Sequence, residues 1–277
     1  MAILLDGKAT AAALRQEIAD EVTARGIKPG LAVILVGDDP ASRIYVNNKK
    51  KACVAVGFYS EEITLPADVS QDVLIDTVKA LNARADIDGI LCQLPLPQHL
   101  SDRTVIAAID PKKDVDAFHA VNAGNILLGT PTFLPCTPAG IMELLSRYHI
   151  DIDGKRCVVV GRSNIVGKPM ALLLLQKNGT VTVCHSHTRD LAAITREADI
   201  LVAAVGVPHF ITADMVKKGA VVVDVGMDRD ENGKLCGDVD FAAVEPIASA
   251  ITPVPGGVGP MTIAMLLKNT LTACQNK

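Results

Sequence analysis

Apolar positions in the first half of the chain change repeatedly between two periodicities. Spacings of three and four residues predict helices over residues 8–25, 40–56 and 71–83. Strands are predicted between them, near residues 31–36, 58–65 and 87–92. Because helices that alternate with buried strands are typical of βαβ units, we predict an N-terminal α/β domain with a parallel sheet.

A second alternation follows a segment rich in proline and turn residues, 95–137, which we interpret as a cleft wall and connection. Further helices are predicted over residues 138–148, 168–178 and 261–274. Further strands are predicted over residues 156–160, 180–184, 200–205 and 220–225. The expected fold class is therefore α/β with two domains, 1–137 and a Rossmann-like 138–260, and with a cleft between them. A helix within 261–277 is expected to return to the first domain.

Composition and charge exclude several classes of protein. The chain has 277 residues, of which 49% are hydrophobic, and a net charge of -4, so it lacks the basic field that attracts nucleic acid. Neither a signal peptide nor an apolar stretch long enough for a bilayer is present, so a cytoplasmic protein without a membrane partner is expected. The seven cysteines form no CxxC pair, which favours buried thiols over disulfides or a metal site.

A turn that begins at Gly161 joins the strand over 156–160 to the next helix. Unpaired amides at a helix start bind phosphate, and glycine lets the ligand approach the backbone. The spacing differs from G-x-G-x-x-G, and a plain tight turn with Pro169 at the first helical position is the alternative. A strand before the turn and a helix after it favour a dinucleotide site.

The segment after the following strand bears on the type of dinucleotide. An NAD site would normally carry an acid there, whereas residues 182–188 read T-V-C-H-S-H-T. Ser186 and Arg162 could instead hold a 2′-phosphate through charge-assisted hydrogen bonds, although Arg162 is also compatible with a solvated loop charge. The sequence therefore favours NADP.

Candidate catalytic side chains occur in the first domain. Tyr45 and Lys49 lie about 40° apart on one helix face, although a lysine run is also typical of a wet helical surface. Gln93 follows a predicted parallel strand at its carboxyl end, where α/β sheets bind ligands, and Asp116 lies in an extended acidic segment. A turn amide and an ordinary loop charge are the alternatives for these two residues. The glycine-rich loop 253–262 favours a ligand that lies against the main chain.

Seven motifs in this order resemble the bifunctional methylenetetrahydrofolate dehydrogenase/cyclohydrolase family. They are S-x-x-Y-V-x-x-K-x-K, G-I-L-C-Q-L-P-L-P, K-D-V-D, P-C-T-P, V-G-R-S-x-I-V-G-x-P, D-V-G and P-V-P-G-G-V-G-P-M-T. The resemblance covers almost the whole chain. It implies oxidation of 5,10-methylenetetrahydrofolate with NADP, hydrolysis of the methenyl product to 10-formyltetrahydrofolate, a homodimer and a role in purine biosynthesis.

The resemblance also implies roles for single residues. Tyr45 would stack on the folate ring, Lys49 would be the central catalytic group, Gln93 would hold Lys49, and Asp116 would bond the pterin edge. The folate contacts implied in addition are Cys92, Leu94, Pro255, Gly256, Gly257, Val258 and Gly259. The NADP contacts implied are Gly161, Arg162, Ser163, Ser186 and Met227. Ala117 departs from the glycine usual in the family, which puts the backbone beside Asp116 in question.

Three other interpretations stay open at this stage. An NADP-dependent dehydrogenase of small hydroxy or amino acids could share the Rossmann half, but it generally needs an arginine that clamps a carboxylate. A nucleotide-sensing module would bind NADP without turnover. A member of the resembled family that has lost one activity is the third.

Overall fold

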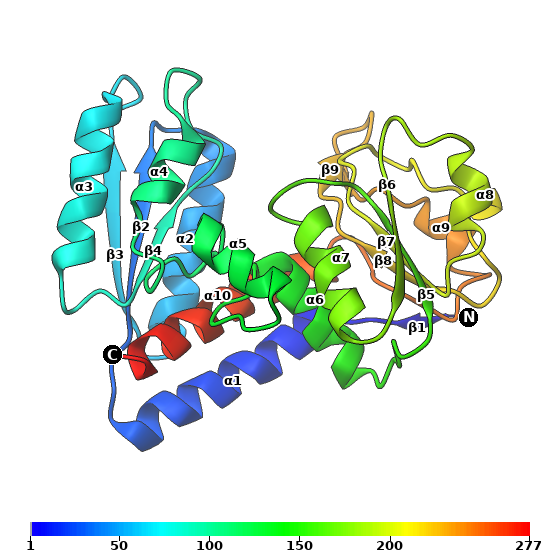
Figure 1. Ribbon diagram of the computed structural model, residues 1–277, viewed down its shortest axis with the longest axis horizontal. Helices are drawn as coiled ribbons and strands as arrows, with labels where there is room; N and C mark the ends of the chain where they lie inside the picture. Colours follow the sequence, from blue (N-terminus) through cyan, green and yellow to red (C-terminus); the bar gives the residue numbers. More distant parts are fainter. Residues whose placement is uncertain (1) are drawn as a thin grey trace. The chain divides into compact units, whose positions relative to one another are not determined.

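The computed structural model describes residues 2–277, which divide by their contacts into two units (Figure 1). One unit contains the chain up to Ala12 and Thr137–Thr262, and we call it the six-stranded unit after its main sheet. The other contains Ala13–Cys136 and Ile263–Lys277, and we call it the three-stranded unit. The predicted two-domain α/β fold with parallel sheets is confirmed.

The three-stranded unit has its most hydrophobic strand in the centre of its sheet. The strands are ordered β3 (Tyr59–Leu65), β2 (Gly30–Val36) and β4 (Gly89–Cys92), and both pairs are parallel. Every residue of β2 is buried, as expected for a strand covered on both faces. The helices of this unit near the sheet are α2 (Pro40–Ala55), which contacts β2 and β3, and α3 (Gln71–Ala83), which contacts β4.

Local capping explains where α2 begins. The Asp39 carboxylate accepts a hydrogen bond from the Ser42 backbone N–H at 2.8 Å, and Pro40 occupies the first helical position, where no N–H is needed. The helix therefore starts directly after the carboxyl end of β2 and carries Tyr45 and Lys49 in its first three turns.

The segment 95–137 is more regular than the sequence analysis expected. It contains the two short helices α4 (Asp102–Ala108) and α5 (Ala120–Leu127). The Ser101 hydroxyl caps α4 through the Thr104 N–H, and the His119 ring caps α5 through the Val121 N–H. Helices of seven and eight residues offer too few turns for a clear apolar period, so proline and turn residues dominated the pattern.

The six-stranded unit is built around an entirely parallel sheet. Its order is β1 (Ile3–Leu4), β11 (Ala250–Ile251), β8 (Val221–Asp224), β7 (Ile200–Ala203), β5 (Arg156–Val160) and β6 (Thr180–Cys184). The chain passes from β5 to the edge strand β6 and then returns to β7 on the other side of β5. The carboxyl ends of β5 and β7 therefore form a topological switch point, the usual ligand position in such sheets.

Short elements complete this unit. They are α6 (Cys136–Arg147), α7 (Gly167–Gln176), α8 (Leu191–Thr195), a 3₁₀ turn (Ala213–Met215), α9 (Phe241–Val244) and the antiparallel pair β9 (Asp228–Arg229) and β10 (Leu235–Cys236). Helix α7 packs against β5 and β6. Two further helices, α1 (Gly7–Arg25) and α10 (Val258–Gln275), begin in the six-stranded unit and continue in the other.

The first residues of the chain group with the six-stranded unit, whereas the sequence analysis placed them in the first domain. Ile3 pairs with Ala250 and Leu4 with Ile251, so β1 extends the sheet beside β11. A strand of two residues has no readable period, which is why its partner could not be inferred from sequence. None of the helices within residues 2–277 combines the length and apolar character needed to cross a membrane.

Helix α10 anchors an irregular segment of the three-stranded unit. The buried Asn269 side chain donates two hydrogen bonds of 2.8 Å, to the carbonyl oxygens of Val115 and Leu134. These carbonyl oxygens lie in loops, where no neighbouring strand donates a hydrogen bond to them. The Asn269 amide group supplies the donors instead.

Replacing Asn269 with leucine should destabilise the protein. The change keeps the volume but removes the donor from two buried carbonyls, which costs about 2–3 kcal/mol of unfolding free energy. Chemical denaturation measures this loss. The same substitution at the exposed Asn276 is the control and should change the unfolding free energy by less than about 0.5 kcal/mol. Equal stabilities of the two variants would contradict this role of Asn269.

Candidate active site

A cavity of about 700 Å³ lies at the switch point of the six-stranded sheet. It is lined by Val160, Gly161, Arg162, Ser163, His185, Ser186, Thr188, Leu191, Ala204, Val205, Val207 and Phe210. Val160 ends β5, Leu191 begins a short helix, and the other residues come from the loops that follow β5, β6 and β7. The size suits a cofactor, and four residues expected to bind NADP, namely Gly161, Arg162, Ser163 and Ser186, meet in this one cavity.

Gly161 is required by the backbone at the end of β5. Its φ angle is 135°, and a Cβ atom at this position would collide with the carbonyl of Ala204, which follows β7. The glycine therefore lets the two strand ends approach each other closely and forms the floor of the cavity.

The start of α7 is partly satisfied within the chain. The Ser163 hydroxyl accepts hydrogen bonds from the backbone N–H groups of Val166 and Gly167 at 3.1 and 3.2 Å. Two of the amides that we expected to be open to phosphate are thus capped by a side chain. The exposed side chains of Arg162 and Ser186 are then the clearest donors for an anion in this cavity.

The loop after β6 bears on the type of cofactor. The His185 backbone N–H donates to the Thr188 hydroxyl at 2.8 Å, which closes a tight turn around the exposed Ser186. No carboxylate is among the residues that line the cavity. A ribose hydroxyl would therefore lack its usual acidic partner, whereas a 2′-phosphate would find a guanidinium and a hydroxyl. These residues fit NADP.

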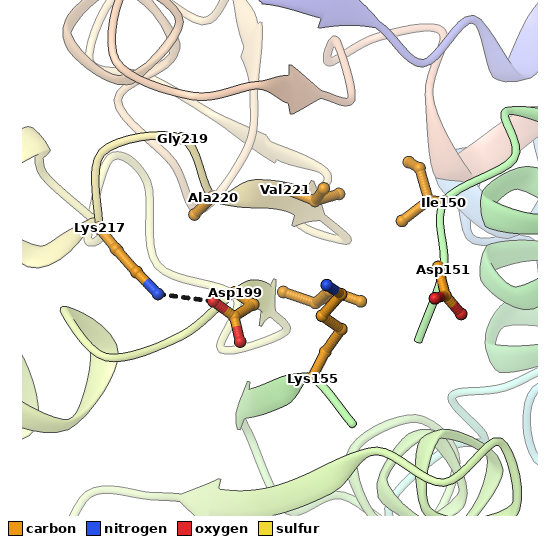
Figure 2. Close-up of a pocket in the computed structure, with 9 residues that line it drawn as sticks. Ile150, Asp151, Lys155, Asp199, Lys217, Gly219, Ala220 and Val221 are labelled. Atoms are coloured by element: carbon orange, nitrogen blue, oxygen red, sulfur yellow. Dashed lines mark hydrogen bonds and ion pairs between the residues drawn. The ribbon is translucent and has the colours of Figure 1, made fainter. Parts of the chain in front are cut away.

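A second, smaller cavity lies at the amino ends of the strands in the same sheet. It measures about 180 Å³ and is lined by residues that precede the strands, among them Lys155, Asp199 and Lys217. Figure 2 shows the Lys217 amine pointing to Asp199, and the two groups form an ion pair of 2.6 Å. Because ligands bind at the carboxyl ends of parallel strands, we assign this ion pair a structural role.

Lys49 lies in the three-stranded unit with a fixed partner. Its amine donates a hydrogen bond to Gln93 Oε1 at 2.9 Å, and Gln93 Nε2 donates to the carbonyl of Leu94 at 2.7 Å. The second bond sets the orientation of the amide, because only the oxygen end can then face the lysine. The predicted pairing of Gln93 with Lys49 is thus present in the geometry.

Asp116 belongs to the same electrostatic group. Burial raises its pKa, the positive charge of Lys49 lowers it, and the neighbouring Asp114 raises it. The Cys136 thiol donates to an Asp116 carboxylate oxygen at 3.6 Å. Tyr45 lies one helical turn before Lys49 in α2 and is 41% exposed. Lysine, amide, carboxylate and phenol are therefore collected in this unit.

Burial raises the pKa of Cys92 to about 12, so its thiol is protonated at neutral pH. The thiolate is the nucleophilic form of cysteine, and Cys92 is therefore suited to contact a ligand rather than to attack it. No group of three or more His, Cys, Asp or Glu side chains within residues 2–277 is placed to hold a metal ion.

Residues 255–259 comprise the end of the loop before α10 and the first two residues of that helix, and they lie in the six-stranded unit, as does Met227. The Gly256 carbonyl accepts a hydrogen bond from the Lys8 N–H at 2.9 Å, and a Cβ atom on Gly7 of α1 would collide with the Gly257 carbonyl, so Gly7 permits this close approach. The Met227 methyl group lies 2.7 Å from the point where a Cβ on Gly259 would stand. Glycine at the second residue of α10 therefore leaves room for the Met227 methyl group.

Sequence reasoning did not identify every residue of the larger cavity. Val205, Val207 and Phe210 line it although no motif marked them. Their position after β7 was the available signal, because the strand order makes that strand the second wall of the switch point.

Two family models match the chain. One, described as the catalytic domain of tetrahydrofolate dehydrogenase/cyclohydrolase, matches residues 5–116, and the other, described as the NAD(P)-binding domain, matches residues 135–277. The chain belongs to the tetrahydrofolate dehydrogenase/cyclohydrolase family. The resemblance inferred from the seven motifs is confirmed.

Relatives match over the full length. The Bifunctional protein FolD of Streptococcus agalactiae is 57% identical over 277 residues, which cover 99% of this chain and 98% of the relative. The FolD methylenetetrahydrofolate dehydrogenase/cyclohydrolase of Campylobacter jejuni is 48% identical, with a TM-score of 0.97 and coverage of 100% and 99%. The Trypanosoma brucei enzyme, solved with NADP and an inhibitor, is 42% identical with a TM-score of 0.95 and coverage of 99% and 98%.

Ala117 has a backbone conformation that favours glycine, the residue that the resemblance implies at this position. Its φ angle is 58°, in the left-handed region, where a non-glycine residue costs about 1–2 kcal/mol. The residue is nevertheless buried, and its N–H donates to the Asp114 carbonyl at 3.0 Å. The turn beside Asp116 therefore keeps a left-handed conformation although the side chain is not hydrogen.

A branched residue at this position should not be tolerated. We expect Ala117→Val to lower the unfolding free energy by about 2 kcal/mol, since a β-branched side chain is strained at positive φ and is buried here. The control, Ala117→Gly, should change it by less than about 1 kcal/mol, because relief of strain offsets the loss of a buried methyl group. Denaturant titration measures both, and a valine variant as stable as the glycine variant would refute this account.

Proposed function

We propose that the protein is a bifunctional enzyme that oxidises 5,10-methylenetetrahydrofolate to 5,10-methenyltetrahydrofolate with NADP and then hydrolyses it to 10-formyltetrahydrofolate. The observation that carries the proposal is the hydrogen bond of 2.9 Å between Lys49 and Gln93, beside Asp116, in a chain of this family. A ring-stacking tyrosine, an amine and a carboxylate together suit a pterin and its one-carbon bridge.

The oxidation step needs little acid–base catalysis from the protein. NADP supplies the hydride acceptor when bound, and the protein must align two rings and exclude water. In this proposal Arg162, Ser163 and Ser186 hold the phosphates of NADP, Gly161 lets its backbone approach, and Met227 covers the nicotinamide side. The one-carbon bridge of a folate bound at Tyr45 and Asp116 must come close enough to the nicotinamide ring for hydride transfer. Cys92, Leu94 and residues 255–259 complete the proposed folate contacts.

The hydrolysis needs water activated for attack on the carbon between two nitrogens, and a proton delivered to the nitrogen whose bond to that carbon breaks. Lys49 is the group proposed for this step. A neutral amide such as Gln93 positions the amine without adding the negative charge that a carboxylate would place against it. Asp116 hydrogen-bonds the pterin edge and thereby fixes the distance between the bridge carbon and the amine.

The proposal has further parts that concern the setting of the enzyme. We infer a homodimer, a cytoplasmic location and a supply of formyl groups to purine biosynthesis, on the grounds of family membership. Domain roles follow the units: the chain around Lys49 binds folate and the Rossmann-like unit binds NADP. A dehydrogenase of small hydroxy or amino acids is not favoured, because both family models and the full-length relatives are tetrahydrofolate enzymes.

The direct experiment supplies methylenetetrahydrofolate with NADP or NAD and follows reduced cofactor and 10-formyl product together. We expect both products, and faster reduction of NADP than of NAD. Reduced cofactor without formyl product would identify a member that has lost hydrolysis. Binding of NADP without any turnover would refute the enzymatic proposal.

Lys49→Met should abolish hydrolysis of methenyltetrahydrofolate, with a loss of at least about 100-fold, because the positioned amine is removed while the stem is kept. The decay of methenyl absorbance measures the rate. Lys51→Met, an exposed lysine on the same helix, is the control and should hydrolyse at the wild-type rate. Unaltered hydrolysis by a folded Lys49→Met variant would rule out the proposed role.

Arg162→Ala should raise the Michaelis constant for NADP about tenfold or more and that for NAD less than about twofold, because only the 2′-phosphate loses a charged partner. Arg156→Ala provides the control, since this exposed arginine lies at the amino end of β5 and pairs with Glu197. Equal effects of Arg162→Ala on both cofactors would count against a 2′-phosphate contact.

A further inference from the structure

The loop that forms one wall of the large cavity is held by a buried carboxylate. Asp238 is completely buried, and its two carboxylate oxygens accept hydrogen bonds from the backbone N–H groups of Val205 and Val207, at 2.7 and 2.9 Å. Both valines line the cavity assigned to NADP. Between them lies Gly206 with a φ angle of 69°. The Asp238 side chain thus hydrogen-bonds both ends of a left-handed turn.

A second buried carboxylate fixes Asp238 itself. Asp224, at the carboxyl end of β8, accepts hydrogen bonds from the backbone N–H groups of Asp238, Val239 and Gly226, each at 2.9 Å. Burial raises the pKa of Asp224 to about 6, and the charge of Asp238 adds to this rise. A third acid, Asp228, has a pKa raised by burial and then by the charge of Asp238.

This arrangement is costly and specific. Burying acids close to one another opposes their ionisation, so each buried carboxylate needs hydrogen-bond donors around it. All the donors to Asp224 and Asp238 named above are backbone groups, so the carboxylates impose the path of the main chain rather than neutralise a cation. The segments tied in this way follow β7, β8 and β10.

We propose that Asp238 is a positioning residue for the dinucleotide: it holds the turn 205–207 in the shape that the cofactor requires before the cofactor binds. The inference rests on the proposed function, because it takes NADP as the occupant of the cavity. A loop that is already ordered loses no conformational entropy when the cofactor binds. Loss of the hydrogen bonds to Asp238 therefore lowers the affinity for NADP without changing the reacting atoms.

Asp238→Asn tests the inference with little change in shape. The amide has one acceptor oxygen and one donor NH₂, so one of the two valine N–H groups faces a donor. The dissociation constant for NADP should rise about tenfold, whereas kcat at saturating NADP should stay within about threefold. Hydrolysis of methenyltetrahydrofolate without NADP should be unchanged, because Lys49 belongs to the other unit.

Asp88→Asn is the matched control. It also removes a buried charge that accepts a backbone hydrogen bond, from the Gly30 N–H at 2.8 Å, but Asp88 lies in the other unit and does not line the cavity. It should lower thermal stability as much as Asp238→Asn does, while NADP affinity changes less than about threefold. Equal losses of affinity in the two variants would show a merely structural role and overturn the inference, as would an Asp238→Asn variant with wild-type affinity.

Hydrogen exchange on the wild-type protein decides the matter even if Asp238→Asn fails to fold. The amides of Val205 and Val207 should be protected before NADP is added, to a degree similar to the neighbouring strand. Exchange as fast as in an unstructured loop until NADP is added would overturn the inference. A wild-type protein that does not bind NADP at all would instead refute the proposed function. Exchange at Val205 and Val207 would still show whether their N–H groups are held by hydrogen bonds.

Discussion

Parallel strand pairing is the constraint on which the rest of the structure depends. In a parallel sheet the carboxyl ends of all strands lie at the same end of the sheet, so the loops that follow β5, β6 and β7 lie close to one another. The close approach of Gly161 to Ala204 and the cavity lined by both loops follow from that register. The same rule acts in the three-stranded unit, where Gln93 follows β4 and its N–H donates to Ile34 of β2 at 2.9 Å.

The two units satisfy their irregular backbone in different ways. In the three-stranded unit, the neutral side chain of Asn269 supplies donors to carbonyls of the segment beside Asp116. In the six-stranded unit, the charged side chains of Asp224 and Asp238 supply acceptors to N–H groups. The difference reflects what the loops leave unpaired, carbonyls in the first case and N–H groups in the second. Each solution places a buried polar group directly behind residues proposed to contact ligand.

The predictability of the fold varied with element length. The long periodic helices and buried strands around residues 40–56, 71–83, 156–160 and 200–205 appear near the predicted positions. The pairing of β1 with β11 and the helices α4 and α5 could not be read from the pattern, because each is too short to show a period. Among site residues, Lys49 and Gln93 were predicted from motif and helix face. Asp238 was not, because its role depends on a contact with a loop more than thirty residues earlier in the chain.

The contrast between Gln93 and Asp238 follows from the chemistry that each must support. Lys49 needs a partner that fixes its amine, and an amide oriented by the Leu94 carbonyl does so through its oxygen. The turn 205–207 needs a strong acceptor at both of its ends, and only a carboxylate offers two oxygens to two N–H donors in one plane. Gln93 adds no further charge beside Lys49 and Asp116, whereas the charge of Asp238 behind the turn strengthens both of its hydrogen bonds. The choice between a neutral and a charged side chain therefore depends on the group that it holds, which is an amine that already has a carboxylate nearby in the first case and two backbone N–H groups in the second.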